Sequence, residues 1–270
     1  MVKKKVLFVA QEITPYLPES HMSKIGRYLP QKIQESGREI RVFMPRFGLV
    51  NERRNQLHEV IRLSGMNLII EDIDHPLIIK VASIQQARMQ VYFIENEDYF
   101  HRKFIFRDKA GAFFKDNDER TIFFSRGVLE TVKKLGWAPD VIHCQGWFSG
   151  LMPLFLKTVY KNNPLFSDVK LVISLYNDGF EESFSKDFAN KIRTSGIPEE
   201  ALQYYEEGNY VSFMKSAMNY ADAFIVGDKK INEELLDYAK KSGKPFLDYQ
   251  GDENYFEAFN QFYDQIIENN

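Results

Sequence analysis

Residues 139–157 read "PDVIHCQGWFSGLMPLFLK", and this stretch decides the fold. Its first part, "DVIHCQ", is a short and mostly apolar run that is typical of a buried strand, and a helix over about residues 148–161 follows it directly. A buried strand that leads straight into a helix is the repeating unit of a parallel sheet with right-handed crossovers. The stretch therefore predicts an α/β protein.

The same strand-then-helix unit recurs on both sides. The pattern predicts strands at residues 5–10, 39–45, 170–176 and 223–227 and helices at 22–37, 118–135, within 198–220 and at 229–242. Segment 66–97 differs, because three strand-like runs follow one another with only short polar breaks, which indicates a β-meander insertion. We therefore expect a single doubly wound, Rossmann-like domain with a mostly parallel sheet.

Composition limits the partners and the environment. The chain has 270 residues, 44% of them hydrophobic, which suffices for a sizeable core. Its 35 basic and 38 acidic residues nearly balance, so nothing indicates nucleic acid or a membrane as a partner. The apolar runs are too short for a transmembrane helix, and Gln11 and Glu12 end the first run too early for a signal peptide. Cys144 is the only cysteine, so an internal disulfide is excluded, and we expect a cytoplasmic protein.

The C-terminal segment 252–268 has a broad apolar stripe at helical spacing. The stripe consists of Tyr255, Phe256, Phe259, Phe262, Tyr263, Ile266 and Ile267. A stripe this apolar must be buried, and we expect the helix to fold back onto the sheet domain. The chain then divides into a domain at 1–250 and a packed-back helix at 251–270. The alternative is a dimer contact through the same stripe.

Ligands of doubly wound sheets bind beyond the carboxyl ends of the strands, near the point where the strand order reverses. The loops that matter here begin at Glu12, Gln145 and Tyr176, and after Val226. They carry no metal-ligand spacing, nucleophile triad or G-x-S-x-G motif.

These loops and their neighbours resemble the bacterial glycogen synthases and plant starch synthases. Residues 139–157 resemble that family's P-D-V-x-H-x-x-D-W-x-x-G-L-x-P-x-x-L run. The stretches "KVLFVAQEITPYLPE", "VYFIENEDYFHRKFIF" followed by "KDNDERTIFFSRGVLE", and "FMKSAMNYADAFIVGDKKINEEL" are similar to its other motifs. The order and spacing match over roughly residues 4–240, and several co-linear motifs are more specific than a lone glycine motif.

The resemblance implies a fold and an activity. The family transfers glucose from a nucleotide sugar, usually ADP-glucose, to the non-reducing end of an α-1,4-glucan. Its members have two Rossmann-like domains with the site between them, and the first domain contributes mainly glucan binding and the glucose side of the cleft. This chain resembles the N-terminal half alone, so we expect most donor contacts to be missing from it.

The first site loop departs from the family. The family's K-x-G-G-L becomes Pro18, Glu19, Ser20, His21 and Met22, which replaces a lysine and two glycines that approach the donor. Glu19 adds repulsion toward a phosphate. His21 can donate to an anion, but a loop histidine is more often a solvated surface residue.

The loop after the strand at 170–175 departs as well. Tyr176 and Asn177 stand where the family has His-Asn, and the histidine is thought to face the transferred glucose. Tyrosine is unsuited to proton exchange at neutral pH but can stack on a sugar, and Asn177 can still bond a hydroxyl. Glu181 and Glu182 allow a glycosidase interpretation, but an acidic loop is usually only solvated.

The third loop keeps part of its motif. The family's D-W becomes Gly146-Trp147, so the aspartate is lost. Trp147 is either a sugar platform or a core residue under the following helix, and His143 is either a catalyst or a hydrogen-bonded structural residue. The D-N-x-E-R-F motif survives as residues 116–121, where Asn117 or Asp118 is expected to cap the helix that follows.

Three hypotheses remain. The first is an active glucosyltransferase whose nucleotide-binding domain comes from a partner chain. The second, which the residues favour, is a non-catalytic relative in glycogen metabolism that binds α-glucan or a synthase partner. The third is an unrelated small-molecule-binding Rossmann domain. We expect no cofactor, no metal and no catalytic residue, and we expect a nucleotide sugar only as a secondary ligand. The residues expected to bind substrate are Tyr176, Asn177, Trp147, His143 and His21.

Overall fold

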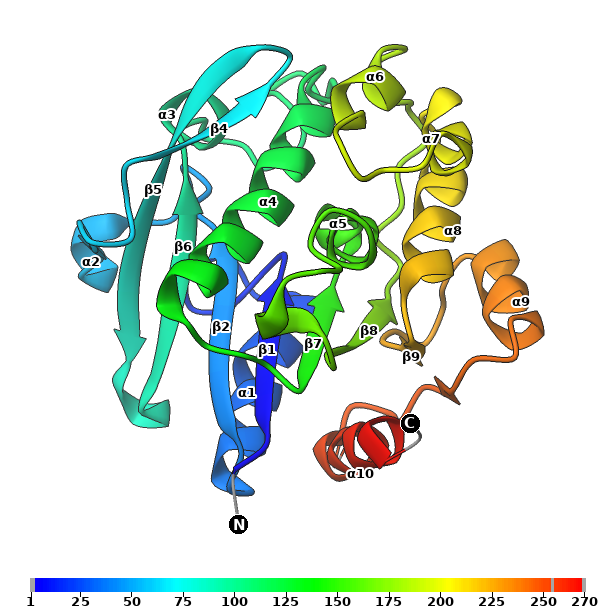
Figure 1. Cartoon of the computed structure of the whole chain (residues 1–270). Helices are drawn as coiled ribbons and strands as arrows, with labels where there is room; N and C mark the ends of the chain where they lie inside the picture. Colours follow the sequence, from blue (N-terminus) through cyan, green and yellow to red (C-terminus); the bar gives the residue numbers. More distant parts are fainter. Residues whose placement is uncertain (1–2, 254, 269–270) are drawn as a thin grey trace.

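The computed structural model of the chain describes residues 3–253 and 255–268 (Figure 1). The strands are β1 (Lys5–Ala10), β2 (Glu39–Pro45), β3 (His58–Glu59), β4 (Met66–Ile70), β5 (Ile73–Ile84), β6 (Met89–Glu95), β7 (Val141–Gln145), β8 (Lys170–Leu175), β9 (Ala223–Val226) and β10 (Phe246–Leu247). They form a sheet in the order β10-β9-β8-β7-β1-β2-β6-β5-β3, and β4 pairs with β5 off this path.

The strand order reverses beside β1. The chain moves from β1 to β2 on one side and later returns to place β7 on the other, and both pairings are parallel. Between β10 and β6 in this order, every pair of adjacent strands is parallel. The predicted doubly wound, mostly parallel α/β fold is therefore confirmed.

The meander at residues 66–97 is joined to this sheet. β4 and β5 are antiparallel, and so are β5 and β6, as the three adjacent apolar runs predict. β6 also pairs in parallel with β2, so the last strand of the meander belongs to the main sheet. The meander thus forms one end of the sheet.

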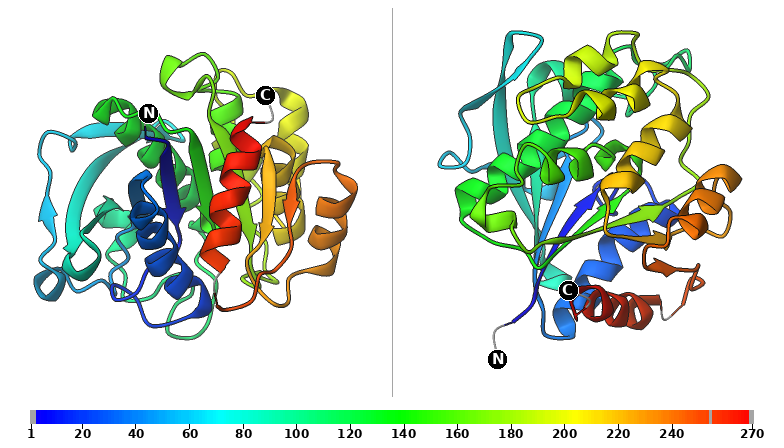
Figure 2. Two further views of the ribbon diagram at one scale, coloured as in Figure 1. Left: turned by 90° about the horizontal axis from the view of Figure 1, so that it is seen from below. Right: turned by 45° about the vertical axis from the view of Figure 1, so that its right-hand side comes forward.

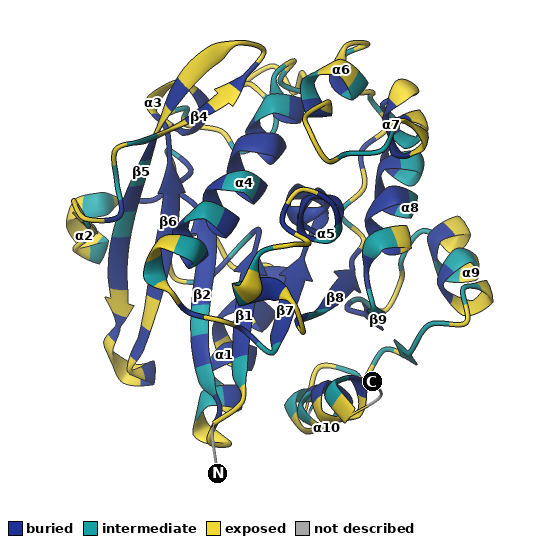
Figure 3. Cartoon of the chain, in the orientation of Figure 1, coloured by how far each residue is buried: buried dark blue, intermediate teal, exposed yellow. Residues whose placement is uncertain are grey.

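Helices cover both faces of the sheet. They are α1 (His21–Glu35), α2 (Glu52–Asn55), α3 (Glu97–Phe100), α4 (Asn117–Leu135), α5 (Met152–Lys157), α6 (Phe188–Ile192), α7 (Glu199–Glu206), α8 (Tyr210–Tyr220), α9 (Glu233–Lys241) and α10 (Tyr255–Glu268). Figures 1 and 2 show α4, α5 and α8 on one face and α1 and α10 on the other. The central strands between these layers are buried, as Figure 3 shows.

Helix α10 packs back against the sheet domain. Phe259, Phe262, Tyr263 and Ile266 are buried on its inner face. The Tyr263 hydroxyl lies 2.7 Å from Nδ1 of His143 on β7. Arg38 donates to the Asn260 side chain and pairs with Asp264 at 2.7 Å. The apolar stripe of α10 therefore faces the chain's own sheet.

Several local predictions were wrong. The helix expected over about 148–161 is a 3-10 turn (Trp147–Ser149) followed by the short α5, and Pro153 lies in the first turn of α5. A Cβ at Gly150, between the two, would lie 2.5 Å from the Phe213 ring, so the chain passes too close to α8 for another side chain. The short elements β3, α6 and β10 went unpredicted because they are too short to show a period.

The predicted caps of α4 were also wrong. The helix has Asp116 at its N-cap position, without a side-chain capping bond. Asn117 instead donates to the Phe106 carbonyl at 2.9 Å and accepts from Arg120 at 2.6 Å. The motif therefore holds the segment that precedes α4, and it does not cap the amino end of the helix.

Candidate functional site

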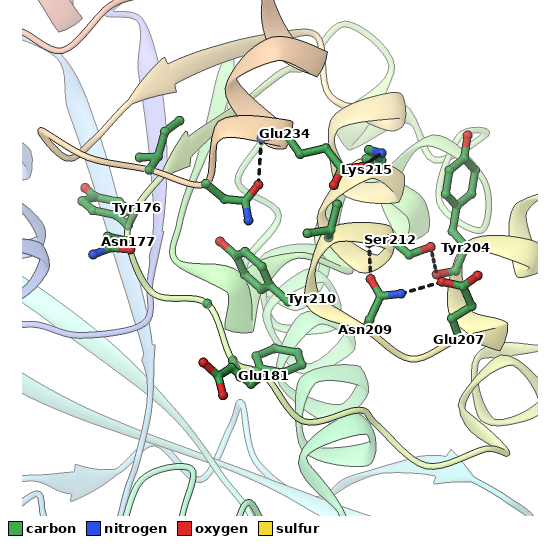
Figure 4. Close-up of a pocket in the computed structure, with 15 residues that line it drawn as sticks. Tyr176, Asn177, Glu181, Tyr204, Glu207, Asn209, Tyr210, Ser212, Lys215 and Glu234 are labelled. Atoms are coloured by element: carbon green, nitrogen blue, oxygen red, sulfur yellow. Dashed lines mark hydrogen bonds and ion pairs between the residues drawn. The ribbon is translucent and has the colours of Figure 1, made fainter.

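An open cleft lies beside the carboxyl ends of β8 and β9. Its volume is about 750 Å³. The loop after β8, the junction of α7 and α8, and the start of α9 form its walls, as Figure 4 shows. The labelled lining residues are Tyr176, Asn177, Glu181, Tyr204, Glu207, Asn209, Tyr210, Ser212, Lys215 and Glu234.

Helix caps hold the polar wall of the cleft in place. Asn209 precedes α8, and its side-chain oxygen accepts from the Ser212 backbone N–H at 2.8 Å while its nitrogen donates to Glu207 at 2.6 Å. Asn232 caps α9 in the same way, through the Glu234 backbone N–H at 3.0 Å. An asparagine just before a helix satisfies backbone donors that would otherwise lack partners. The wall is therefore fixed by local sequence.

Asp178 joins the cleft to the loop after β7. One of its oxygens accepts from the Trp147 backbone N–H at 2.8 Å, and the other accepts from the Tyr210 hydroxyl at 3.0 Å. Burial raises the pKa of Asp178 to about 6, although both hydrogen bonds favour the ionised form. The Asp178 carboxylate thus ties two strand-end loops to α8.

Tyr176 and Asn177 both reach the cleft. The Asn177 side chain is exposed there. The Tyr176 ring is 2% exposed, and a Cβ at Gly227 would lie 2.7 Å from it, so glycine alone fits opposite the ring. Within residues 3–253 and 255–268, the buried Tyr176 hydroxyl has no hydrogen-bond partner, and burial raises its pKa well above the ordinary value. Tyr176 therefore forms part of the wall of the cleft, while Asn177 presents an exposed side-chain amide to the cleft.

Trp147 and His143 lie in the interior. Trp147 is 2% exposed and packs among phenylalanines, with ring centroids 4.7 Å from Phe106 and 5.0 Å from Phe180. His143 is fully buried, with Nε2 2.6 Å from the Ser174 hydroxyl, and burial lowers its pKa to about 3. Neither ring reaches the cleft in this structure.

His21 lies near the Tyr176 ring but does not line the cleft. The centroids of the two rings are 6.3 Å apart. The His21 Nε2 lies 2.8 Å from the Gly227 carbonyl oxygen. Of the five predicted binding residues, the structure therefore brings Tyr176 and Asn177 together at the cleft and places His21 next to Tyr176.

The amino end of α1 carries an acidic turn. The Ser20 hydroxyl accepts from the Ser23 backbone N–H at 2.9 Å and donates to the Glu12 carboxylate at 2.6 Å. Glu19 pairs with Lys24 at 3.2 Å. The turn thus satisfies one of its own helix donors and places a carboxylate beside it.

Gly146 has no room for a side chain. Its φ is +85°, and an added Cβ would lie 2.7 Å from the Gln11 side chain. An aspartate at this position would require both a strained backbone and a shift of Gln11. The packing around Gly146 therefore leaves no room for the aspartate that the resemblance implies at this position.

The walls from α7, α8 and α9 were not predicted. These walls consist of residues 204–215 and 231–234. They reach the cleft through the packing of helices, and the sequence predicts the order of these helices along the chain but not their positions in space. Asn209 before α8 and Asn232 before α9 were the local signals, since asparagine before a helix marks a cap. Among residues 3–253 and 255–268, no group of three or more His, Cys, Asp or Glu side chains is placed to hold a metal ion.

None of the helices in the described part of the chain combines the length and the apolarity needed to cross a membrane.

Comparisons of sequence place the chain among known proteins. Residues 5–247 match the family model described as the starch synthase catalytic domain. The glycogen synthase of Chlorobium limicola is 37% identical over 234 residues, and that of Chlorobium phaeobacteroides is 41% identical over 233 residues. Each alignment covers 86% of this chain and 47% of the relative. The chain thus spans about half the length of these curated relatives.

A comparison of structures agrees on the fold. The catalytic domain of starch synthase IV from Arabidopsis thaliana, solved with ADP and acarbose, superposes with a TM-score of 0.70 at 16% identity. The match covers 92% of this chain and 51% of that one.

Proposed function

Because the chain belongs to the glycogen and starch synthase family, we propose that it serves α-glucan metabolism by binding glucan, and that it transfers no glucose on its own. The synthase-like fold and family rest on the matches over most of its length. The proposal that the chain binds glucan but does not transfer glucose rests on two places, the acidic turn at α1 and the cleft at β8. These two places differ in chemistry.

The acidic turn at α1 carries the proposal. A diphosphate leaving group needs positive charge or free backbone N–H groups at the amino end of a helix. Here Ser20 already accepts from the first turn, and Glu12 adds a negative charge beside it. Lys24, the cation close to this turn, is paired with Glu19. These contacts support weak or absent binding of a nucleotide sugar.

The cleft at β8 supports the binding of glucan. Its volume of about 750 Å³ falls within the range of small-ligand sites, roughly 300–1,000 Å³. The half-buried Tyr204 offers an aromatic side chain, and Asn177 and Glu181 offer an exposed amide and an exposed carboxylate. Sugar rings bind to such surfaces through aromatic contact and modest hydrogen bonds. A short α-1,4-oligosaccharide suits this cleft.

Titration calorimetry with maltoheptaose tests the binding half of the proposal. We expect saturable binding that acarbose, the ligand of the starch synthase IV catalytic domain, also shows. ADP-glucose in the same cell should give no heat beyond dilution. Binding of ADP-glucose, or no binding of maltoheptaose at millimolar concentration, would contradict the proposal.

A second function is favoured by one observation. Asn177 keeps its position at the cleft with its amide exposed, so the glucose side of a transferase site is partly retained. The chain would then act as a glucosyltransferase when a synthase partner chain supplies the nucleotide-binding half. Mixing it with the separately produced C-terminal half of a glycogen synthase tests this. Transfer that neither protein shows alone would establish the second function.

A further inference from the structure

A small hollow lies beside Tyr176, which also lines the cleft. His21, Tyr176 and Gly227 line the hollow together with the chain's own later residues 249–251, Tyr255 and Phe259. The remaining volume is about 10 Å³, so the hollow is almost filled. It lies at the carboxyl ends of β8 and β9, where doubly wound folds bind their ligands. The chain itself therefore occupies part of its binding edge.

Residues 248–253, here named the strap, are weakly attached to the rest of the described chain. Their side-chain hydrogen bonds stay within the strap: Tyr249 donates to Asp252, and Gln250 donates to the Asp248 carbonyl. Within residues 3–253 and 255–268, no backbone hydrogen bond joins the strap to the sheet or its helices. Segments with so few bonds to the body open at low free-energy cost.

His21 is the residue that meets the strap. Its ring centroid lies 6.2 Å from that of Tyr249. Nε2 faces the Gly227 carbonyl oxygen at 2.8 Å, and because a carbonyl only accepts, Nε2 must carry the hydrogen. In the neutral ring Nδ1 is then an acceptor, yet it faces an oxygen of Asp252 at 3.6 Å. Protonation turns this pair of acceptors into an ion pair.

We propose that residues 248–253 form a pH-dependent strap, which protonated His21 clasps through Asp252 and which neutral His21 releases. Histidine is the side chain that ordinarily changes charge between pH 5 and 8. The ion pair with Asp252 therefore forms only when the His21 ring is protonated.

Other ionisable groups surround His21. Tyr176 from β8 stays neutral because burial raises its pKa, and Tyr249 and Tyr255, with pKa values of about 12, stay neutral as well. Asp228 lies after β9, and Glu19, paired with Lys24, lies on the side of α1. Asp178 titrates nearby, but its bonds run to Trp147 and Tyr210.

The strap has a consequence for the cleft. Tyr176 lines both the hollow and the open cleft, so the strap supports one wall of the site from behind. Release of the strap should loosen that wall and weaken glucan binding. This consequence rests on the proposed function, whereas the clasp itself does not.

Limited proteolysis after Tyr249 tests the clasp on the full chain, because chymotrypsin cleaves the strap only when it opens. His21→Gln keeps an N–H donor for Gly227 but cannot be charged, and comparing the two proteins at one pH removes the effect of pH on the protease and on Asp178. We expect the strap of the wild type to be cleaved about 1.5- to 5-fold more slowly than that of His21→Gln at pH 5.5, and equally at pH 7.5. Equal rates at both pH values would overturn the proposal.

Two strap variants guard against a folding effect of the His21 change. Asp252→Asn, at an exposed position, should remove the protection at pH 5.5. Glu253→Gln removes the same charge one residue away and should leave the protection in place. An equal effect of both variants would show a general charge effect and overturn the clasp. Cleavage reports on the strap even if the cleft binds no maltoheptaose, so the two proposals can fail separately.

Discussion

Asp178 shows how one side chain connects the site. Trp147 is buried among aromatic rings and Tyr210 faces the cleft, and Asp178 accepts a hydrogen bond from each. The Asp178 carboxylate stays within the fold despite a desolvation cost that raises its pKa to about 6. A group with a raised pKa makes stability depend on pH, and the sign of that dependence can be measured.

We expect Asp178→Asn to flatten the pH dependence of stability. Between the ordinary pKa of an aspartate, about 4, and the folded value of about 6, the folded state binds more protons than the unfolded state. The contribution of Asp178 is therefore fully present below pH 4 and is lost as the pH rises through 6. Urea unfolding at pH 4.5 and 7.5 should show a smaller change for Asp178→Asn than for the wild type.

Asp168→Asn, at an exposed position, is the matched control and should keep the wild-type dependence on pH. Equal changes in all three proteins would show that Asp178 does not titrate in this window.

Asn177 is expected to contact glucan directly. One hydrogen bond contributes about 0.5–1.5 kcal/mol, so Asn177→Ala should raise the Kd for maltoheptaose roughly 2- to 13-fold. Asn67→Ala, which removes an exposed amide on β4, should leave the Kd unchanged. Titration calorimetry measures both, and an equal effect of the two variants would place glucan elsewhere.

The sequence predicted only part of the site at this scale. Tyr176 and Asn177 directly follow a strand that ends at the ligand-binding edge, so their place could be predicted. His143 lies two residues before the end of β7 and is therefore inside the sheet. Trp147 follows the end of β7, yet its ring turns into the aromatic cluster, which only the packing of distant phenylalanines decides.

At the scale of elements, α10 is fixed to the sheet by polar contacts as well as by its apolar stripe. His143 lies between two partners, the Ser174 hydroxyl at 2.6 Å and the Tyr263 hydroxyl at 2.7 Å. All three groups are buried, so water cannot replace a lost partner. The hydrogen bond thus specifies where α10 sits on β7.

We expect Tyr263→Phe to lower the free energy of unfolding by about 1–3 kcal/mol, because it leaves a buried nitrogen of His143 without a partner. Tyr255→Phe is the control at the start of the same helix, where the ring is half-buried, and it should change the value by less than about 0.5 kcal/mol. Denaturant unfolding separates the two. A similar loss in both variants would mean that the bond to His143 contributes nothing specific.

Removal of residues 251–270 tests the role of the whole helix. Four side chains, those of Phe259, Phe262, Tyr263 and Ile266, are buried on its inner face, and each contributes roughly 1.5–3 kcal/mol before entropy costs. The shortened chain should aggregate or unfold at a lower temperature. A shortened chain that stays monomeric and equally heat-resistant would show an independent tail.

The motif at residues 116–121 shows why the local sequence predicts a helix but not the contacts that the helix makes. Arg120 is fully buried and donates to the Tyr99 carbonyl at 2.8 Å and to the Ile105 carbonyl at 2.7 Å. The sequence indicated a helix start here, and α4 does begin at Asn117. The partners of Arg120 lie 15 and 21 residues away, so no local pattern could reveal them.

At the scale of the whole molecule, the fold was predictable and the cleft was not. Alternating strands and helices determine a parallel sheet, and right-handed crossovers leave few possible topologies. The cleft instead depends on how α7, α8 and α9 are packed around the loop after β8. The same edge of the sheet carries the cleft at β8, which we propose binds glucan, and the acidic turn at α1, which we propose disfavours a nucleotide sugar.

The most direct test measures binding and transfer in one tube. The chain is incubated with glycogen and labelled ADP-glucose, the glycogen is sedimented, and both the bound protein and the incorporated label are counted. The same measurement with UDP-glucose and with a complete glycogen synthase provides the controls. We predict that the chain sediments with glycogen while the label stays at the level of the protein-free blank. Label above the blank that Asn177→Ala abolishes, or a chain that stays in the supernatant, would contradict the account.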